Sequence, residues 1–186
     1  MTRPSDHLLR TLAPVPPSCN ILEVGCGKGR HTESLLRLGF PVHACAADAE
    51  SVAATRDRIT DLVGPDTAAT CVQHVPPGGF GTYPDDAFHW IVAHTPSGYV
   101  DVPEHLPGWL GSMRRLLIPG GWLYLAVGTP DPAANGTSRP ALRPDEMTAH
   151  ALRSGLKTAE DAAQTDEEGG PLVRGIFRLA PDVTSP

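Results

Sequence analysis

The chain has 186 residues, of which 40% are hydrophobic and 19% are charged, and its formal net charge is −6. This length predicts one domain that buries roughly 70% of the surface of its unfolded chain, so it needs no disulfide or metal to hold it together. The negative charge argues against a nucleic-acid partner, because affinity for phosphate comes largely from lysine and arginine.

We expect no membrane partner either, because no apolar run approaches the roughly 20 residues of a membrane span. Prolines and charged residues interrupt the N-terminus, which therefore lacks the apolar core of a signal peptide. The cysteines and histidines show no C-x-x-C or H-E-x-x-H spacing, so we expect no metal site. The composition predicts a cytoplasmic protein with reduced, mostly buried thiols at Cys19, Cys26, Cys45 and Cys71.

The segment before Asn20 is expected to form a short helix and a proline-rich lead-in. Ser5 is suited to cap a helix from His7 to Leu12, and the leucines of this segment lie on one side. The prolines that follow, from Pro14 to Pro17, end the helix.

The segment Asn20 to Thr32 reads Asn-Ile-Leu-Glu-Val-Gly-Cys-Gly-Lys-Gly-Arg-His-Thr. Its apolar start predicts a buried parallel strand, and a helical pattern follows from about Arg30 to Leu38. Gly25, Gly27 and Gly29 lie between them, and glycine allows positive φ and lets a ligand press against bare backbone. The pattern predicts a nucleotide-type binding turn. The alternative is a turn that only closes a strand–helix corner.

The spacing of these glycines helps to choose the ligand. Arg30 falls where the third glycine of a dinucleotide fingerprint would stand, which disfavours a nicotinamide cofactor. The segment Leu22 to Gly29 instead resembles the first motif of the class I S-adenosylmethionine-dependent methyltransferases. The resemblance implies S-adenosylmethionine as the cofactor, with Glu23 helping to hold its amino group and the turn lining it through Gly25, Cys26, Gly27 and Gly29.

A second strand is predicted from Phe40 to Cys45, and a helix from Glu50 to Val63. This alternation is typical of an α/β fold with a doubly wound, mostly parallel sheet. The family usually has an acid at the tip of the second strand, where it binds the ribose, but that position falls on Ala46. Asp48 is the nearest acid, and it is suited either to reach the ribose or to cap the following helix.

Thr70 to Val75 is predicted as the third strand. Many members of the family place an acid just past this strand, against the adenine amino group. Gln73 and His74 are the candidates here, and either offers only a neutral hydrogen bond.

Phe88 to Ala93 is predicted as the fourth strand, with His89 where the family commonly has an aspartate. Ligands of open α/β sheets bind outside the carboxyl ends of the strands, so we expect His94, Thr95 and Tyr99 to line the boundary between cofactor and substrate. His94 is either a general base for the methyl acceptor or a packing residue.

The second half of the chain supplies another match. The segment Arg114 to Leu125 resembles the family's helix, Pro-Gly-Gly turn and fifth strand. The remaining predictions are a helix over Pro103 to Leu117, a loop over Gly128 to Pro140, a helix over Pro144 to Ser154, and a hairpin of Thr158 to Gln164 with Leu172 to Leu179 around Gly169 and Gly170.

The resemblance covers Asn20 to Leu179 and implies a Rossmann-like methyltransferase fold of seven strands with an antiparallel C-terminal strand. The predicted organisation is a lead-in over residues 1–19, a methyltransferase domain over 20–180 and a tail over 181–186. In related methyltransferases a helix like that of the lead-in covers the cofactor or shapes the substrate pocket, and the alternative is simple packing on the sheet.

The implied function is methyl transfer from S-adenosylmethionine to an unidentified small molecule, and the sequence indicates neither a catalytic residue nor an oligomeric state. The alternative is a non-catalytic relative that serves as a binding or interaction module, because Ala46 and His89 replace common acids.

Overall fold

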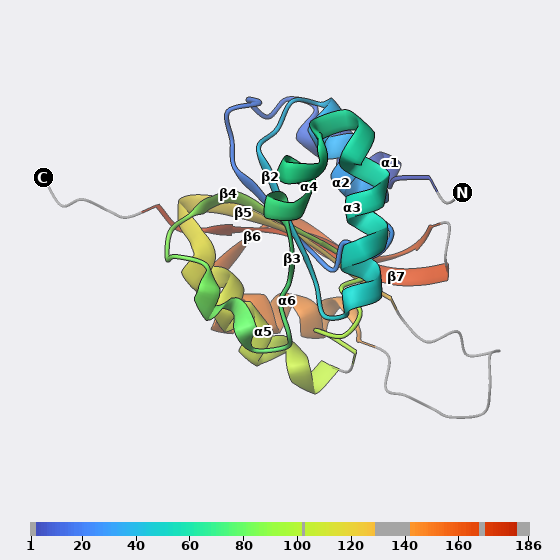
Figure 1. The fold of residues 1–186 in the computed structure, drawn as a ribbon. Helices are drawn as coiled ribbons and strands as arrows, with labels where there is room; N and C mark the ends of the chain where they lie inside the picture. Colours follow the sequence, from blue (N-terminus) through green and yellow to red (C-terminus); the bar gives the residue numbers. More distant parts are fainter. Residues whose placement is uncertain (1–2, 102, 129–141, 168–169, 182–186) are drawn as a thin grey trace, which may run out of the picture.

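The computed structural model describes residues 3–101, 103–128, 142–167 and 170–181. They form one seven-stranded sheet in the order β3-β2-β1-β4-β5-β7-β6, with helices on both faces (Figure 1). The strands are β1 (Ile21–Val24), β2 (Val42–Ala46), β3 (Val72–His74), β4 (Phe88–His94), β5 (Leu117–Gly128), β6 (Leu156–Glu167) and β7 (Gly170–Leu179). Strands β1 to β5 pair in parallel, and β7 runs antiparallel to both β5 and β6. The predicted doubly wound sheet is thus confirmed.

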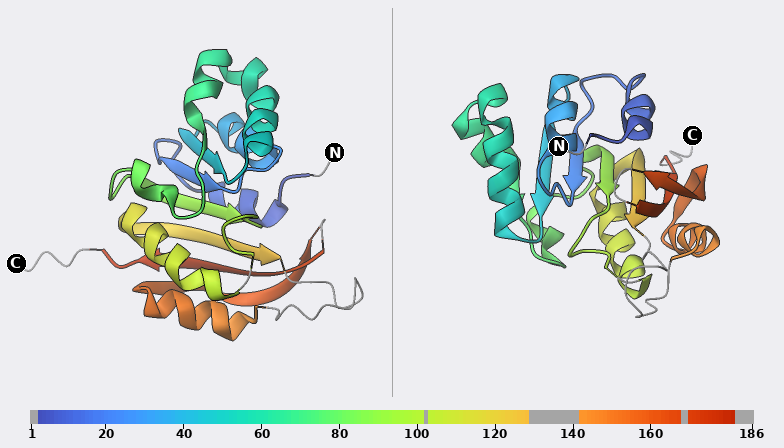
Figure 2. Two further views of the ribbon diagram at one scale, coloured as in Figure 1. Left: turned by 60° about the horizontal axis from the view of Figure 1, so that its bottom comes forward. Right: turned by 90° about the vertical axis from the view of Figure 1, so that its right-hand side faces the viewer.

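The helices cover the sheet in two layers (Figure 2). They are α1 (Asp6–Leu12), α2 (Arg30–Arg37), α3 (Ala49–Val63), α4 (Pro65–Cys71), α5 (Leu106–Leu116) and α6 (Pro144–Arg153), with the 3-10 turns η1 (Gly79–Thr82) and η2 (Pro103–His105). Helices α5 and α6 pack on one face, and α1, α2 and α3 pack on the other. Among the described residues no helix combines the length and apolarity needed to cross a membrane.

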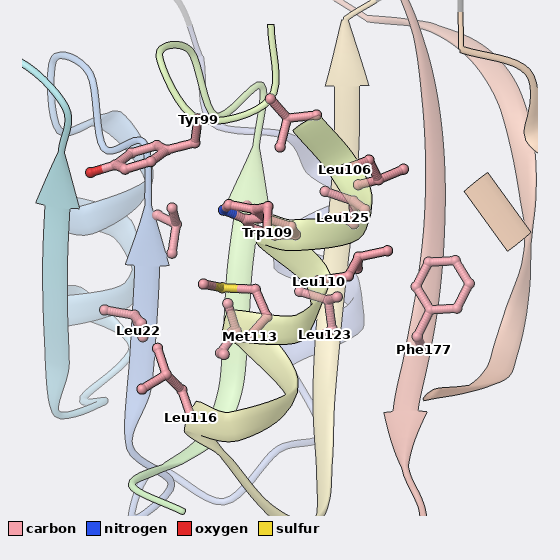
Figure 3. Close-up of a cluster of buried hydrophobic side chains, with 14 of the residues drawn as sticks. Leu22, Tyr99, Leu106, Trp109, Leu110, Met113, Leu116, Leu123, Leu125 and Phe177 are labelled. Atoms are coloured by element: carbon pink, nitrogen blue, oxygen red, sulfur yellow. The ribbon is translucent and has the colours of Figure 1, made fainter. Parts of the chain in front are cut away.

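Helix α5 anchors the larger core (Figure 3). Its apolar residues recur at helical spacing, as the sequence predicted, and each is at most 5% exposed. They pack against Leu22 of β1, Leu123 and Leu125 of β5 and Phe177 of β7. The buried residues of the helix are Leu106, Trp109, Leu110, Met113 and Leu116.

The predicted third strand is wrong at its start. Thr70 lies in α4, and β3 comprises only Val72–His74. Pro65 follows the end of α3 as expected, but it is also the first residue of α4. The first N–H groups of a helix have no partner within the helix, so proline loses no hydrogen bond there. Gly64, with a φ of 82°, separates the two helices.

The Pro-Gly-Gly segment does not form a separate turn before the fifth strand. It lies inside β5, and the pairing of β4 with β5 shifts register between Phe88 and Trp90. Gly120 has a φ of 80°. Position i+2 of a type II turn requires such a positive φ, so Gly120 keeps a turn-like conformation although the segment lies within the strand.

Other boundaries differ from the predictions by a few residues. The second strand begins at Val42 rather than Phe40, α5 begins at Leu106 after η2, and the first arm of the C-terminal hairpin extends from Leu156 to Glu167. The predicted loop from Gly128 to Pro140 lies almost entirely outside the described residues, as does Gly169.

The N-terminal helix forms as predicted. Ser5 Oγ accepts a hydrogen bond from the backbone N–H of Leu8, and the helix ends at Leu12 before the prolines. Leu8 and Leu12 are completely buried on the sheet, so α1 contributes to the same core as α2.

Candidate functional site

A pocket of about 230 Å³ lies where the carboxyl ends of β1, β2 and β4 meet. Glu23, Gly29 and His74 do not line it, although the sequence grouped them with the site. The predicted residues that do line it are Gly25, Cys26, Gly27, Ala46, Asp48, His94 and Thr95, and five others join them: Lys28, Arg30, His31, Ser51 and Ser97.

The three glycines of the turn meet different neighbours. A Cβ at Gly25 would lie 2.6 Å from Pro96 Cα, so this glycine lets the tips of β1 and β4 touch. A Cβ at Gly29 would lie 3.0 Å from Thr55 Cγ2 on α3. Gly27 has a φ of 55° and faces open space. It is therefore the glycine that offers bare backbone to a ligand.

Glu23 lies beneath the pocket. Its side chain is 2% exposed, and the hydroxyl of Thr32 donates a hydrogen bond to Oε2. Burial raises the pKa of Glu23 to about 7, against the smaller lowering by Thr32 and Arg30. The carboxyl is therefore about half protonated near neutral pH and largely protonated below it, and its expected contact with a cofactor ammonium stays a prediction.

His94 is held by an acid from the far end of the sheet. Its Nε2 lies 2.9 Å from Oε2 of Glu167 in β6, and Glu167 also accepts hydrogen bonds from Ser5 Oγ and Arg174. Burial raises the pKa of Glu167, but His94, Ser5 and Arg174 together keep it below its ordinary value. An ionised carboxylate only accepts, so the proton of the His94 ring is on Nε2.

This arrangement leaves Nδ1 of His94 as a bare acceptor, buried and without a hydrogen-bond partner among the described residues. Burial lowers the pKa of His94, although Glu167 opposes the shift. The ring is thus a neutral imidazole with its acceptor unused, which suits a ligand contact or a proton-accepting role.

His31 contacts both His94 and the segment that precedes α1. The two rings lie 4.7 Å apart between centroids, and His31 Nε2 accepts the backbone N–H of Ser5 at 3.1 Å. Burial, His94 and Arg30 lower the pKa of His31 to about 2, so it is uncharged. The segment before α1 is therefore bonded directly to this side of the site.

Asp48 caps α3, which is one of the two roles expected for it. Its Oδ1 accepts the backbone N–H of Ser51 at 2.7 Å, and this bond lowers the pKa of Asp48. Asp48 and Ser51 also line the pocket, whereas Ala46 offers no polar side-chain atom there. On this side of the pocket Asp48 and Ser51 supply the side-chain oxygen atoms.

His74 and Tyr99, which were expected at the site, bond outside the pocket, and so does His89. The exposed ring of His74 bonds through Nε2 to the carbonyl oxygen of Ala47 at 2.9 Å. Tyr99 is buried, and its hydroxyl donates to the carbonyl oxygen of Val75, so it joins the ends of β3 and β4 instead of lining the pocket. His89 lies at the amino end of β4, where Nδ1 accepts the backbone N–H of Asn20.

Thr95 carries backbone strain at the tip of β4. Its φ of 52° is unusual for a β-branched residue. Such a conformation costs on the order of 1–3 kcal/mol, and strain of this kind concentrates at functional sites. The backbone N–H of Thr95 donates to the carbonyl oxygen of Ala126 at 2.7 Å, which holds the strained residue at the pocket.

Sequence reasoning missed several residues of the site. His31 was detectable as the second residue of a helix that begins at the binding turn, and Ser51 as the third residue of α3. Glu167 carries no local signal, because only the sheet order brings it to His94. The sequence identified Ser5 only as a helix cap, and its bond to Glu167 has no local signal either.

A family model described as a methyltransferase domain matches residues 2–160. This chain belongs to that methyltransferase family. No curated protein sequence matches it. Within the described residues no group of histidine, cysteine, aspartate and glutamate is arranged to hold a metal ion.

Solved structures share the fold. A SAM-dependent methyltransferase from Methanosarcina mazei superimposes with a TM-score of 0.71 at 14% identity, covering 97% of this chain and 100% of its own. Geranyl diphosphate methyltransferase in complex with SAM gives 0.68 at 15% identity, covering 94% and 84%. The [4+2]-cyclase SpnF gives 0.70 at 15% identity, covering 95% and 81%. At this identity the likeness shows the fold, and the fold alone does not fix the reaction.

The buried carboxyl of Glu23 predicts a pH-dependent stability. Its folded pKa of about 7 lies above the ordinary value of 4.5. Its protonated form therefore stabilises the fold below pH 4.5, and that stability is lost as pH rises to 7. The loss is about 3 kcal/mol. The buried, neutral His31 acts in the opposite sense, because its low pKa makes the fold more stable as pH rises toward 6.5. We therefore compare each variant with the unsubstituted protein. Relative to it, the free energy of urea unfolding of Glu23→Gln should rise by about 3 kcal/mol from pH 4.5 to 7.5.

Glu33→Gln is the matched control. Arg58 and Arg37 lower the pKa of Glu33, so its contribution is present above pH 4.5 and is lost on acidification. The difference in unfolding free energy between Glu33→Gln and the unsubstituted protein should stay nearly constant from pH 4.5 to 7.5. No rise in the relative stability of Glu23→Gln over this range would show that the Glu23 carboxyl is already ionised in the folded protein.

Proposed function

We propose that this protein transfers a methyl group from S-adenosylmethionine to a small-molecule acceptor at the pocket above β1, β2 and β4. The observation that carries the proposal is Gly27, whose bare backbone faces open space at the carboxyl edge of the sheet. The family match supports it, and so does His94, which lines the pocket and has an unpartnered, buried Nδ1.

Different residues of the pocket bind different parts of the cofactor. The cofactor supplies an already activated methyl group, so the protein's task is mainly to hold the reacting groups in line. The backbone at Gly27 receives one part of the cofactor, and Asp48 and Ser51 offer oxygens to its hydroxyls. Cys26 takes no chemical part, because burial raises the pKa of its thiol to about 12.

His94 is the group best placed to accept a proton from the methyl acceptor. Glu167 fixes its tautomer and leaves Nδ1 as the acceptor atom, which is the orienting role of an acid in a base–acid pair. Nδ1 is covered in this structure, and a bound ligand has to reach it by displacing neighbouring groups.

Binding of the cofactor is tested by thermal unfolding with S-adenosylmethionine, S-adenosylhomocysteine and NAD in turn. A ligand at a hundred times its dissociation constant adds about 2.7 kcal/mol, which raises the midpoint by roughly 5–11 °C for a domain of this size. We expect a shift with the first two ligands alone. A shift with NAD only, or with none of the three, would contradict the proposal.

Gly27→Ala locates the binding in the turn. The added methyl group faces the pocket. We therefore expect affinity for S-adenosylhomocysteine, measured by calorimetry, to fall about tenfold or more, which corresponds to ~1.4 kcal/mol. Gly64→Ala is the control, since Gly64 also has positive φ and open space but lies between α3 and α4. Gly64→Ala should destabilise the fold at least as much as Gly27→Ala, because both place alanine at a positive φ. It should leave the affinity for S-adenosylhomocysteine unchanged.

The alternative function is a binding module that kept the fold without catalysis, and Ala46 favours it because the usual ribose acceptor is missing. Ala46→Asp distinguishes the two cases by calorimetry with S-adenosylmethionine. Affinity that rises by about 1.5–3 kcal/mol, the scale of a charged hydrogen bond, indicates a degraded site. Little change, which we expect, means that Asp48 or Ser51 already makes the contact.

A further inference from the structure

A second cavity lies at the opposite end of the strands from the proposed cofactor pocket. It has a volume of about 480 Å³. Small-molecule sites typically have volumes of roughly 300–1,000 Å³. The floor of the cavity includes Trp90 and Trp122, which are cross-strand neighbours near the amino end of β4 and on β5. A ligand here would not meet a methyl group held above the carboxyl ends of the strands.

The length of α1 explains why this part of the sheet is uncovered. A helix as short as α1 spans only about 10 Å. The buried leucines of α1 pack on the sheet beside α2. Pro14, Pro16 and Pro17 then prevent the helix from continuing over this end of the sheet. The proline-rich segment lines the cavity instead, through Pro14, Val15 and Pro16.

The tryptophans form an ordered aromatic wall. Trp90 and Trp122 stack with centroids 5.3 Å apart and an interplanar angle of 8°. The guanidinium of Arg178 lies 5.0 Å from the centroid of Trp122, and its Nε donates to the carbonyl oxygen of Gly120. The indole of Trp90 and the guanidinium of Arg178 therefore both lie against the ring of Trp122. A ligand would contact the edge of this ring. Ring edges are electropositive and attract the face of another aromatic ring.

The polar groups of the cavity restrict the charge of its ligand. Glu160 is the charged side chain among the described lining residues, and it already pairs with His7 at 3.1 Å. His89 also lines the cavity, and because its Nδ1 accepts the backbone N–H of Asn20, its ring proton is on Nε2. Arg178 beside the wall is already bonded to Gly120 and lies over Trp122. The carboxylate in the wall and the net charge of −6 then disfavour an anion.

We propose that this cavity is a second ligand site, which takes a neutral, planar aromatic molecule with one hydrogen-bond acceptor. The ring lies against the edges of Trp90 and Trp122, and the acceptor faces His89. The site is separate from the proposed cofactor pocket and does not depend on methyl transfer.

Two dyes with the same ring system test the charge requirement by fluorescence titration. N-phenyl-1-naphthylamine is neutral, and 1-anilinonaphthalene-8-sulfonate adds only a sulfonate. We expect the neutral dye to bind at one site, at least about tenfold more tightly than the sulfonate, and without competition from S-adenosylhomocysteine. No binding of the neutral dye, equal or tighter binding of the sulfonate, or competition with S-adenosylhomocysteine would overturn the proposal.

Cys19 locates the bound dye without any substitution. It lines the cavity and is half-buried, whereas Cys26, Cys45 and Cys71 are buried. At ten times its dissociation constant the neutral dye should slow alkylation of Cys19 by N-ethylmaleimide about tenfold, read by mass spectrometry. An unchanged rate at saturating dye would place the dye elsewhere and refute the site.

Val15→Trp fills the cavity from the proline-rich segment, and Leu38→Trp adds the same side chain at the 46% exposed Leu38, which does not line the cavity. We expect the first variant to lose dye binding and the second to keep it. Light scattering at the titration concentration excludes a second copy as the occupant. A dimer that the neutral dye dissociates would instead assign this face to self-association and overturn the proposal.

Discussion

The proposed cofactor site depends on the close approach of the chain at the ends of β1, β2 and β4. A Cβ at Gly25 would lie 2.6 Å from Pro96 Cα, and one at Gly98 would lie 2.7 Å from the Cβ of Ala47. These two contacts bring the loop after β4 against the tips of its neighbours, and no larger side chain fits at either position. The open backbone of Gly27 and the strained backbone of Thr95 then face the same pocket.

The polar groups around this junction are kept uncharged or fully bonded. His31 and His94 are neutral, burial favours the protonated form of Glu23, and Glu167 accepts from three donors. An isolated ion in such surroundings would cost several kcal/mol. Ser5 takes part through both its backbone and its hydroxyl, so the N-terminal segment is bonded to the same network as the pocket.

The sequence predicted what is encoded locally. The glycines after β1, the helical spacing of α5 and the serine before α1 each have a physical meaning that neighbours in the sequence reveal. The start of β3 was mistaken because Pro65 was read only as a helix end, although proline is also favoured at the first position of a helix.

The sequence did not predict contacts between residues that only the order of strands in the sheet brings together. Glu167 is 73 residues from His94 and 162 from Ser5, and no spacing rule joins them. The tautomer of His94, and with it the acceptor atom that faces no partner, follows only from that pairing. The uncovered Trp90 and Trp122 also required the structure, because they become neighbours only through the register of β4 with β5.

Hydrogen exchange of the backbone amides, followed by mass spectrometry with and without S-adenosylhomocysteine, tests the central claim most directly. The account predicts slower exchange in the peptides that contain Gly25 to Arg30, Asp48 to Ser51 and Thr95 to Ser97, because these segments line one pocket. Exchange around Trp122 should not change. Protection confined to the region of Trp90 and Trp122, or no protection with saturating ligand, would contradict the account.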